Sequence, residues 1–105
     1  MYGTVARLKV KPGSEPALQA LSDRMAAEDM QSVRGYLGEV VYRLDSGDGE
    51  YLLAVLFTDR AAYEANAQDP RQHSRYQTLR DLLTADPEWH DGEVIHAGGR
   101  LGSLA

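Results

Sequence analysis

The sequence contains no cysteine, which excludes disulfide bonds, a thiol nucleophile and a thiolate metal site. It is also short of positive charge, because 11 Lys and Arg residues stand against 16 Asp and Glu and are scattered along the chain. Nucleic acids and anionic membrane surfaces attract clustered basic residues, so we expect neither as a partner. The longest apolar run, YLLAVLF, is too short to span a bilayer, and MYGTVARLKV lacks the apolar core of a signal peptide. These absences predict a soluble, cytoplasmic protein.

What the 105 residues do contain is enough for one hydrophobic core, because 43% of them are hydrophobic. Stretches of β-branched and aromatic residues predict strands, and apolar residues at helical spacing predict helices. The SGDG segment at 46–49 predicts a turn between two strands, and Pro70 interrupts the second helical region. The expected elements are a strand at 2–11, a helix at 15–30, strands at 36–45 and 50–58, a two-part helix at 59–67 and 71–84, and a strand at 92–97.

This order of elements predicts an α+β fold of the ferredoxin-like βαββαβ type, with a four-stranded antiparallel sheet and helices on one face. The domain is expected to cover 1–97, and 98–105 to form a glycine-rich C-terminal tail with no pattern of its own. The third strand is apolar at every position from Tyr51 to Phe57, whereas a strand with one wet face alternates. Because the helices cover only one face, we expect a second copy of the chain on the other, which predicts a homodimer.

Three segments carry a resemblance to a known family: VARLKVKPGSEPALQAL, YLLAVLFTDRAAYEANAQDPRQHSRYQTLRDLL and DPEWHDGEV. From about Tyr2 to about His96 the chain resembles the antibiotic-biosynthesis-monooxygenase-like domains of the dimeric α+β barrel superfamily. The resemblance implies two sheets paired into a barrel and a pocket in each subunit between its sheet and its helices. Relatives include cofactor-free oxygenases of aromatic polyketides, quinol oxygenases and heme-degrading enzymes, so the resemblance indicates the fold more firmly than the reaction.

In several of these relatives the second helix contributes a histidine to the pocket, and His73 stands at the matching position. Tyr76 and Arg80 follow it by three and seven residues on nearly one line of a helix, and Tyr63 precedes it by ten. Such a set suits a phenolic substrate, with His73 as base or hydrogen-bond donor, Arg80 as the partner of the phenolate, and the two tyrosines as pocket walls. The alternative is that His73 and Arg80 only flank the buried stripe of the helix.

Other residues bear on cofactors and metals. The heme-degrading relatives pair the helix histidine with a tryptophan and an asparagine, but Tyr63 stands at the tryptophan position and the first strand has no asparagine. The three histidines lie in separate elements without metal-ligand spacing, so we expect neither a metal nor a bound cofactor. Trp89, the only tryptophan, is expected to pack in the core. Arg7 is expected to face a water-filled interior or to pair with a carboxylate such as Glu39.

Three functions remain open at this point. The first is a cofactor-independent monooxygenase acting on a small apolar aromatic or quinol-like molecule. The second is a non-catalytic dimeric barrel that binds a small hydrophobic ligand or serves as an interaction module, and the third is an isomerase or cyclase on the same scaffold. A single enclosed cavity lined by Tyr63, His73 and Tyr76 would favour an enzyme, whereas a His73 that faces bulk water would not.

Overall fold

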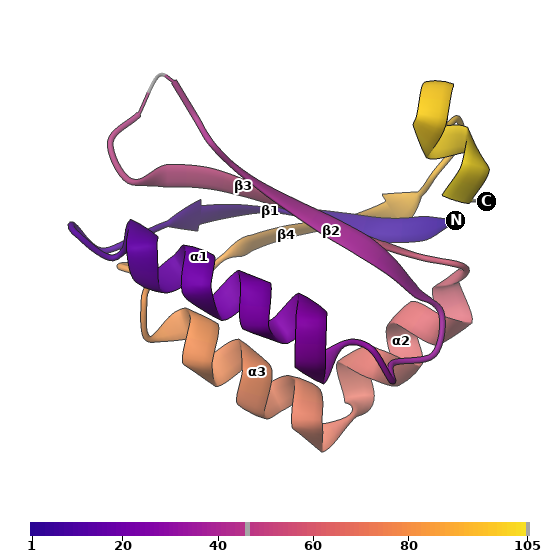
Figure 1. The fold of residues 1–105 in the computed structure, drawn as a ribbon, viewed down its shortest axis with the longest axis horizontal. Helices are drawn as coiled ribbons and strands as arrows, with labels where there is room; N and C mark the ends of the chain where they lie inside the picture. The colour runs from indigo at the N-terminus through magenta and orange to yellow at the C-terminus, as the bar shows by residue number, and fades with distance from the viewer. Residues whose placement is uncertain (46, 105) are drawn as a thin grey trace.

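A computed structural model describes residues 1–45 and 47–104 of the chain. Ser46 of the predicted turn and Ala105 of the predicted tail lie outside the described residues. Figure 1 shows a sheet with the α-helices gathered on one side of it. In chain order the elements are β1 (Tyr2–Lys9), α1 (Glu15–Arg24), the π-helical turn η1 (Met25–Asp29), β2 (Tyr36–Arg43), β3 (Glu50–Phe57), α2 (Arg60–Gln68), α3 (Pro70–Arg80), β4 (Glu88–Glu93) and the 3-10 helix η2 (Gly99–Leu104).

The four strands form one antiparallel sheet in the order β2-β3-β1-β4. β1 is central, because it pairs with β3 along one edge and with β4 along the other. The helices α1, α2 and α3 lie together over a single face of the sheet (Figure 1). This arrangement confirms the predicted ferredoxin-like α+β fold with helices on one face of the sheet.

The two-part second helix follows from local hydrogen bonds at two aspartates. Asp59 precedes α2, and its Oδ1 accepts a hydrogen bond from the Ala62 backbone N–H at 2.8 Å. Asp69 ends α2 and also caps α3, where its Oδ1 accepts from the Arg71 N–H at 2.8 Å. Pro70 is then the first residue of α3, a position where its missing N–H costs no helical hydrogen bond. The predicted interruption at this proline is therefore confirmed.

The fourth strand differs from its prediction. It spans Glu88–Glu93 rather than 92–97, and every residue in it is exposed. The apolar alternation at 92–97 suggested a strand, but Ile95 is 95% exposed and lies beyond the end of β4. An edge strand that pairs with β1 alone tolerates a polar sequence such as EWHDGE. The earlier start has a consequence for function, because it places Trp89 and Asp91 on the side of the sheet that faces the helices.

Other features also differ from the sequence prediction, since β1 ends at Lys9 and α1 gives way to the π-helical turn after Arg24. The second half of the helical region ends at Arg80 instead of continuing to 84. Leu83 has left the helix, forms an isolated bridge with Val10 and is only 1% exposed. Because Leu83 is buried although it lies outside the helix, the apolar pattern of the sequence continues beyond Arg80, where α3 ends. The glycine-rich tail, expected to lack a pattern, contains the 3-10 helix η2.

The core lies between the sheet and the helices, at the end of the sheet where β1 finishes. The core cluster consists of Ala6, Leu8, Val10, Leu18, Tyr51, Leu53 and Leu83.

In the described part of the chain, no helix is long and apolar enough to cross a membrane.

The opposite face of the sheet, called the outer face below, has no α-helix over it (Figure 1). Large apolar side chains there are exposed: Val5 by 43%, Val40 by 53% and Tyr42 by 50%. Leu52 and Leu56 alternate with the buried residues of β3 and are only partly covered. Exposed apolar surfaces of this kind are typical of sites where proteins contact a partner.

Candidate functional site

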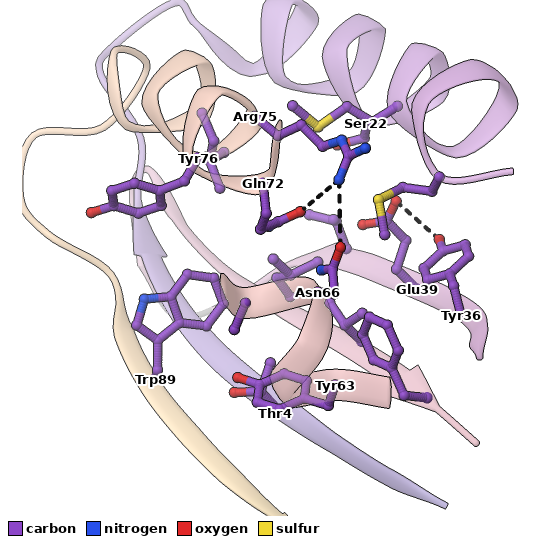
Figure 2. Close-up of a pocket in the computed structure, with 18 of the residues that line it drawn as sticks. Thr4, Ser22, Tyr36, Glu39, Tyr63, Asn66, Gln72, Arg75, Tyr76 and Trp89 are labelled. Carbon is purple, nitrogen blue, oxygen red and sulfur yellow. Dashed lines mark hydrogen bonds between the residues drawn. The ribbon is translucent and has the colours of Figure 1, made fainter. Parts of the chain in front are cut away.

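A cavity of about 480 Å³ separates the helices from the sheet beyond the core cluster. This volume is within the range of small-molecule sites in proteins. Figure 2 shows side chains converging on it from the sheet below and from the helices above. Much of its wall is apolar and comes from the sheet and from α1: Leu8, Leu18, Leu21, Leu53, Val55 and Phe57.

Three of the four residues that the sequence suggested line this cavity together. Tyr63 comes from α2, and His73 and Tyr76 come from successive turns of α3. His73 is exposed, so it lies where the cavity opens to solvent rather than deep inside it. Its Nε2 is 3.3 Å from the side-chain nitrogen of Gln77, which can donate to an unprotonated ring nitrogen. The imidazole is therefore placed to meet both a ligand and water.

Arg80, the fourth candidate, does not belong to the cavity wall. Its Nε donates to Asp86 Oδ1 at 2.7 Å, and its Nη1 donates to the backbone carbonyl of Leu83 at 2.9 Å. These bonds fasten the end of α3 to the segment that leads into β4. His73 and Arg80 are both in α3, as their spacing predicted. Because α3 ends at Arg80, however, the side chain of Arg80 reaches the connection to β4 and not the cavity.

Tyr63 is held in place at the floor of the cavity. Its ring packs against those of Tyr2 and Phe57, with centroids 5.3 and 5.6 Å away, and its hydroxyl donates to Asp91 Oδ1 at 2.8 Å. Burial, followed by this bond to a carboxylate, raises the pKa of Tyr63 to about 12, so the phenol stays protonated. Thr4 lies beside it (Figure 2). The Thr4 hydroxyl is buried in the cavity wall, and its interaction with the Tyr63 hydroxyl opposes this rise of the pKa only in part.

Trp89 forms part of the cavity wall, which corrects the expectation that it packs in the core. The side chain is 42% exposed, and its ring centroid lies 6.5 Å from that of Tyr76. Figure 2 shows the two rings on the same side of the cavity. The shift of β4 toward the N-terminus is the cause, because it turns Trp89 toward the helices next to Ala6. Together the two rings form an aromatic surface against which a planar ligand can stack.

The cation that the sequence reasoning missed is Arg75. Its Nη1 donates to Gln72 Oε1 at 3.1 Å and to Asn66 Oδ1 at 3.5 Å, and its Nη2 donates to the Asp29 carbonyl at 3.2 Å. These bonds, two of them drawn in Figure 2, join α3 to α2 and to the π-helical turn. Arg75, Gln72 and Asn66 all line the cavity. Asn66 follows Tyr63 by one helical turn, and that spacing was a signal for its position.

A carboxyl group, Glu39, was also missed as a cavity residue. Arg7 pairs with Glu50 instead of Glu39, and its side chain lies on the outer face. Glu39 lines the cavity, where the Tyr36 hydroxyl donates to its Oε1 at 3.3 Å. Burial raises the pKa of Glu39, and the hydrogen bond from Tyr36 opposes this only in part. The same burial, with Glu39 adjacent, raises the pKa of Tyr36 to about 12.

The site combines an apolar floor, an aromatic wall and a few polar groups. It can hold a planar molecule against Tyr76 and Trp89, offer hydrogen bonds from several sides, and exchange a proton at His73. Across residues 1–45 and 47–104, His, Asp and Glu side chains form no group of three that could hold a metal ion.

Fold and site together define a class: ferredoxin-like α+β domains with a ligand-sized cavity between the sheet and the helices. The sequence profile for "Antibiotic biosynthesis monooxygenase" matches residues 1–78. The chain therefore belongs to the antibiotic biosynthesis monooxygenase family, and the resemblance described above is confirmed. No curated protein sequence matches the chain.

Solved structures agree with this assignment of the fold. SnoaB, a cofactor-independent oxygenase from Streptomyces nogalater, is 21% identical, with a TM-score of 0.75 over 91% of this chain and 94% of that one. A protein from Mycobacterium tuberculosis is also 21% identical, with a TM-score of 0.73 over 93% of this chain and 98% of that one. At such identities the similarity establishes the fold and leaves the reaction to the site itself.

Proposed function

We propose that the protein is a cofactor-independent monooxygenase that acts on a small aromatic or quinol-like molecule bound in the cavity. The observation that carries the proposal is that Tyr63, His73 and Tyr76 line one cavity whose walls are otherwise mostly apolar. Membership of the antibiotic biosynthesis monooxygenase family supports the same class of reaction. The aromatic surface of Tyr76 and Trp89 supports a planar substrate.

In this proposal His73 is the base, and the substrate provides the electrons. His73 removes a proton from an acidic hydroxyl or ring CH₂ group, and Arg75, which lines the cavity where Arg80 does not, supplies the positive charge for the resulting anion. The electron-rich anion reduces dioxygen. For a substrate with a CH₂ between two aromatic rings, one oxygen atom becomes a new carbonyl. The other leaves as water with the two hydrogens of that CH₂.

Oxygen consumption with 1,8-dihydroxyanthrone tests this proposal. We expect uptake above the spontaneous rate, with one dioxygen consumed per substrate and one heavy oxygen atom in the anthraquinone product when labelled dioxygen is used. Quenching of Trp89 fluorescence reports binding separately, because this tryptophan is the only one in the chain and lines the cavity. Binding without any protein-dependent uptake would overturn the enzyme and leave a non-catalytic barrel that binds a hydrophobic ligand.

We also propose that two copies pair through their outer faces. The exposed Val40 and Tyr42, with the partly covered Leu52 and Leu56 of the neighbouring strand, support this pairing. A stable interface of this kind should be mostly apolar and bury well over ~1,000 Å² in total. Proteins of this family are often dimeric, which also supports the pairing of two copies.

Light scattering at micromolar concentration should give the mass of a dimer. Val40→Asp should shift that mass toward a monomer, because it places a charge within the proposed apolar contact. Val40→Ile, the matched control, should remain dimeric, and far-ultraviolet circular dichroism should show whether each variant stays folded. A wild-type protein that is well folded and monomeric would contradict the pairing.

A further inference from the structure

A β-bulge in β2 decides which of its side chains enter the cavity. Tyr36 pairs with Phe57, and Gly38 pairs with the residue before Phe57, so Leu37 is an extra residue in the ladder. In a regular strand residues three apart point to opposite faces. The bulge instead places both Tyr36 and Glu39 on the cavity side. Gly38 has a φ of 156°, which residues with a side chain rarely adopt and which suits the glycine found there.

Glu39 is consequently a half-buried carboxyl group that lines the cavity. In the described part of the chain its hydrogen-bond partner is Tyr36, and no ion pair involves it. Glu39 also borders a second cavity, of about 420 Å³, between α1 and the edge of the sheet. The other titratable and charged groups that line these two cavities are Glu15, Asp23, Tyr36, Arg43, Tyr51, Tyr63, His73, Arg75, Tyr76 and Asp91.

The two arginines in this set are already engaged. Arg43 donates to both oxygens of Glu15, at 2.5 and 2.9 Å, and Tyr51 donates to the same carboxylate at 2.6 Å. Arg75 is bound by Asn66 and other acceptors on the helices. Neither arginine donates a hydrogen bond to Glu39 or forms an ion pair with it in the described part of the chain. Burial raises the pKa of this half-buried carboxyl, which favours its neutral, protonated state.

We propose that Glu39 selects the ligand of the cavity by donating a hydrogen bond to a carbonyl oxygen of a planar aromatic molecule. The rings of that molecule lie against Tyr76 and Trp89. Figure 2 shows that Glu39 and Tyr36 are on the opposite side of the cavity from these two rings, so a ligand that spans the cavity meets both. The inference rests on the proposed function, which supplies the aromatic ligand, and it adds that this ligand carries a carbonyl group.

The hydrogen-bond roles at this position are complementary. Tyr36 donates to Oε1 of Glu39, so the proton of the neutral acid on the other oxygen is available to the cavity. Burial raises the pKa of Glu39, which extends the pH range over which that proton is present. An ionised carboxylate would repel a carbonyl oxygen instead. A carboxylic acid kept neutral by its surroundings is an effective donor to a substrate oxygen.

Matched tricyclic ligands separate this role from simple hydrophobic binding. 9-Fluorenone and fluorene are both planar and differ in the carbonyl oxygen, whereas 9-aminofluorene carries a cation at neutral pH. Their dissociation constants are measured by calorimetry and by Trp89 quenching, without oxygen. The quantity that matters is the ratio of the fluorene and fluorenone dissociation constants, because it cancels the shared stacking contribution.

In Glu39→Leu the ratio should fall by about 5- to 10-fold from its wild-type value, because the donor is lost while a similar volume is kept. Glu39→Gln keeps an N–H donor and should hold the ratio within about 2-fold. Raising the pH should lower the ratio in the wild type as Glu39 ionises, and should leave it unchanged in Glu39→Gln. Glu28→Gln, at an exposed carboxyl outside the cavity, should behave as the wild type.

A ratio that Glu39→Leu leaves unchanged would overturn the proposal. So would tight binding of 9-aminofluorene that is lost in Glu39→Gln, because Glu39 would then act as an anion toward a cationic ligand. These measurements involve no oxygen chemistry. If the ratio depends on Glu39 but the protein consumes no oxygen, the monooxygenase proposal is rejected and this inference stands. If the protein consumes oxygen but the ratio does not depend on Glu39, only this inference is rejected.

Discussion

Leu53→Asp is expected to abolish stable folding of the domain. Leu53 is 7% exposed and belongs to the core cluster between the sheet and α1. A carboxylate at this position would lose its hydration without gaining a partner, at a cost of several kcal/mol. This is comparable with the whole stability of a small domain, roughly 5–15 kcal/mol. Val55→Asp should have a similar but weaker effect, because Val55 is partly buried beside the cavity.

Arg80→Ala is the comparison variant for this prediction. Arg80 pairs with Asp86, whose side chain is 83% exposed, so the ion pair is near the surface and its loss should cost about 1 kcal/mol or less. Chemical denaturation followed by circular dichroism ranks the variants. We expect no cooperative transition, or a greatly lowered midpoint, for Leu53→Asp and a nearly wild-type midpoint for Arg80→Ala. Equal midpoints would show that the core has been placed wrongly.

His73→Ala is expected to lower the rate of oxygen uptake by roughly 10²-fold or more, because a positioned general base contributes about that much. The imidazole lines the cavity, and the neighbouring Gln77 amide orients its ring. In the variant, quenching of Trp89 by the substrate should remain.

His96→Ala is the matched control, because it removes an exposed histidine that lies beyond β4. Its rate should equal that of the wild type. Gln77→Ala should give an intermediate loss, because it frees the ring of His73 without removing it. A wild-type rate in His73→Ala would leave this histidine as the edge of a helix and would reject its role as the base.

The order of elements was predictable because it depends on local signals. Asp59, Asp69 and Pro70 define the two-part helix through caps and a missing N–H, and both features act within a few residues of the chain. The apolar β3 indicated a sheet that needs cover on both faces. The ends of weakly patterned elements were not predictable, as β4 shows, because an edge strand with all its residues exposed carries no hydrophobic pattern.

For the site, the sequence by itself placed Tyr63, His73 and Tyr76 on neighbouring helices, because helical spacing and the family resemblance are both readable along the chain. Only the tertiary structure decided that Arg75 replaces Arg80 at the cavity and that Trp89 becomes part of its wall. It also decided that Glu39 points inward, since one extra residue in β2 reverses the face of every side chain that follows. Strand register and bulges depend on pairing with distant segments, so spacing along a single strand cannot specify them.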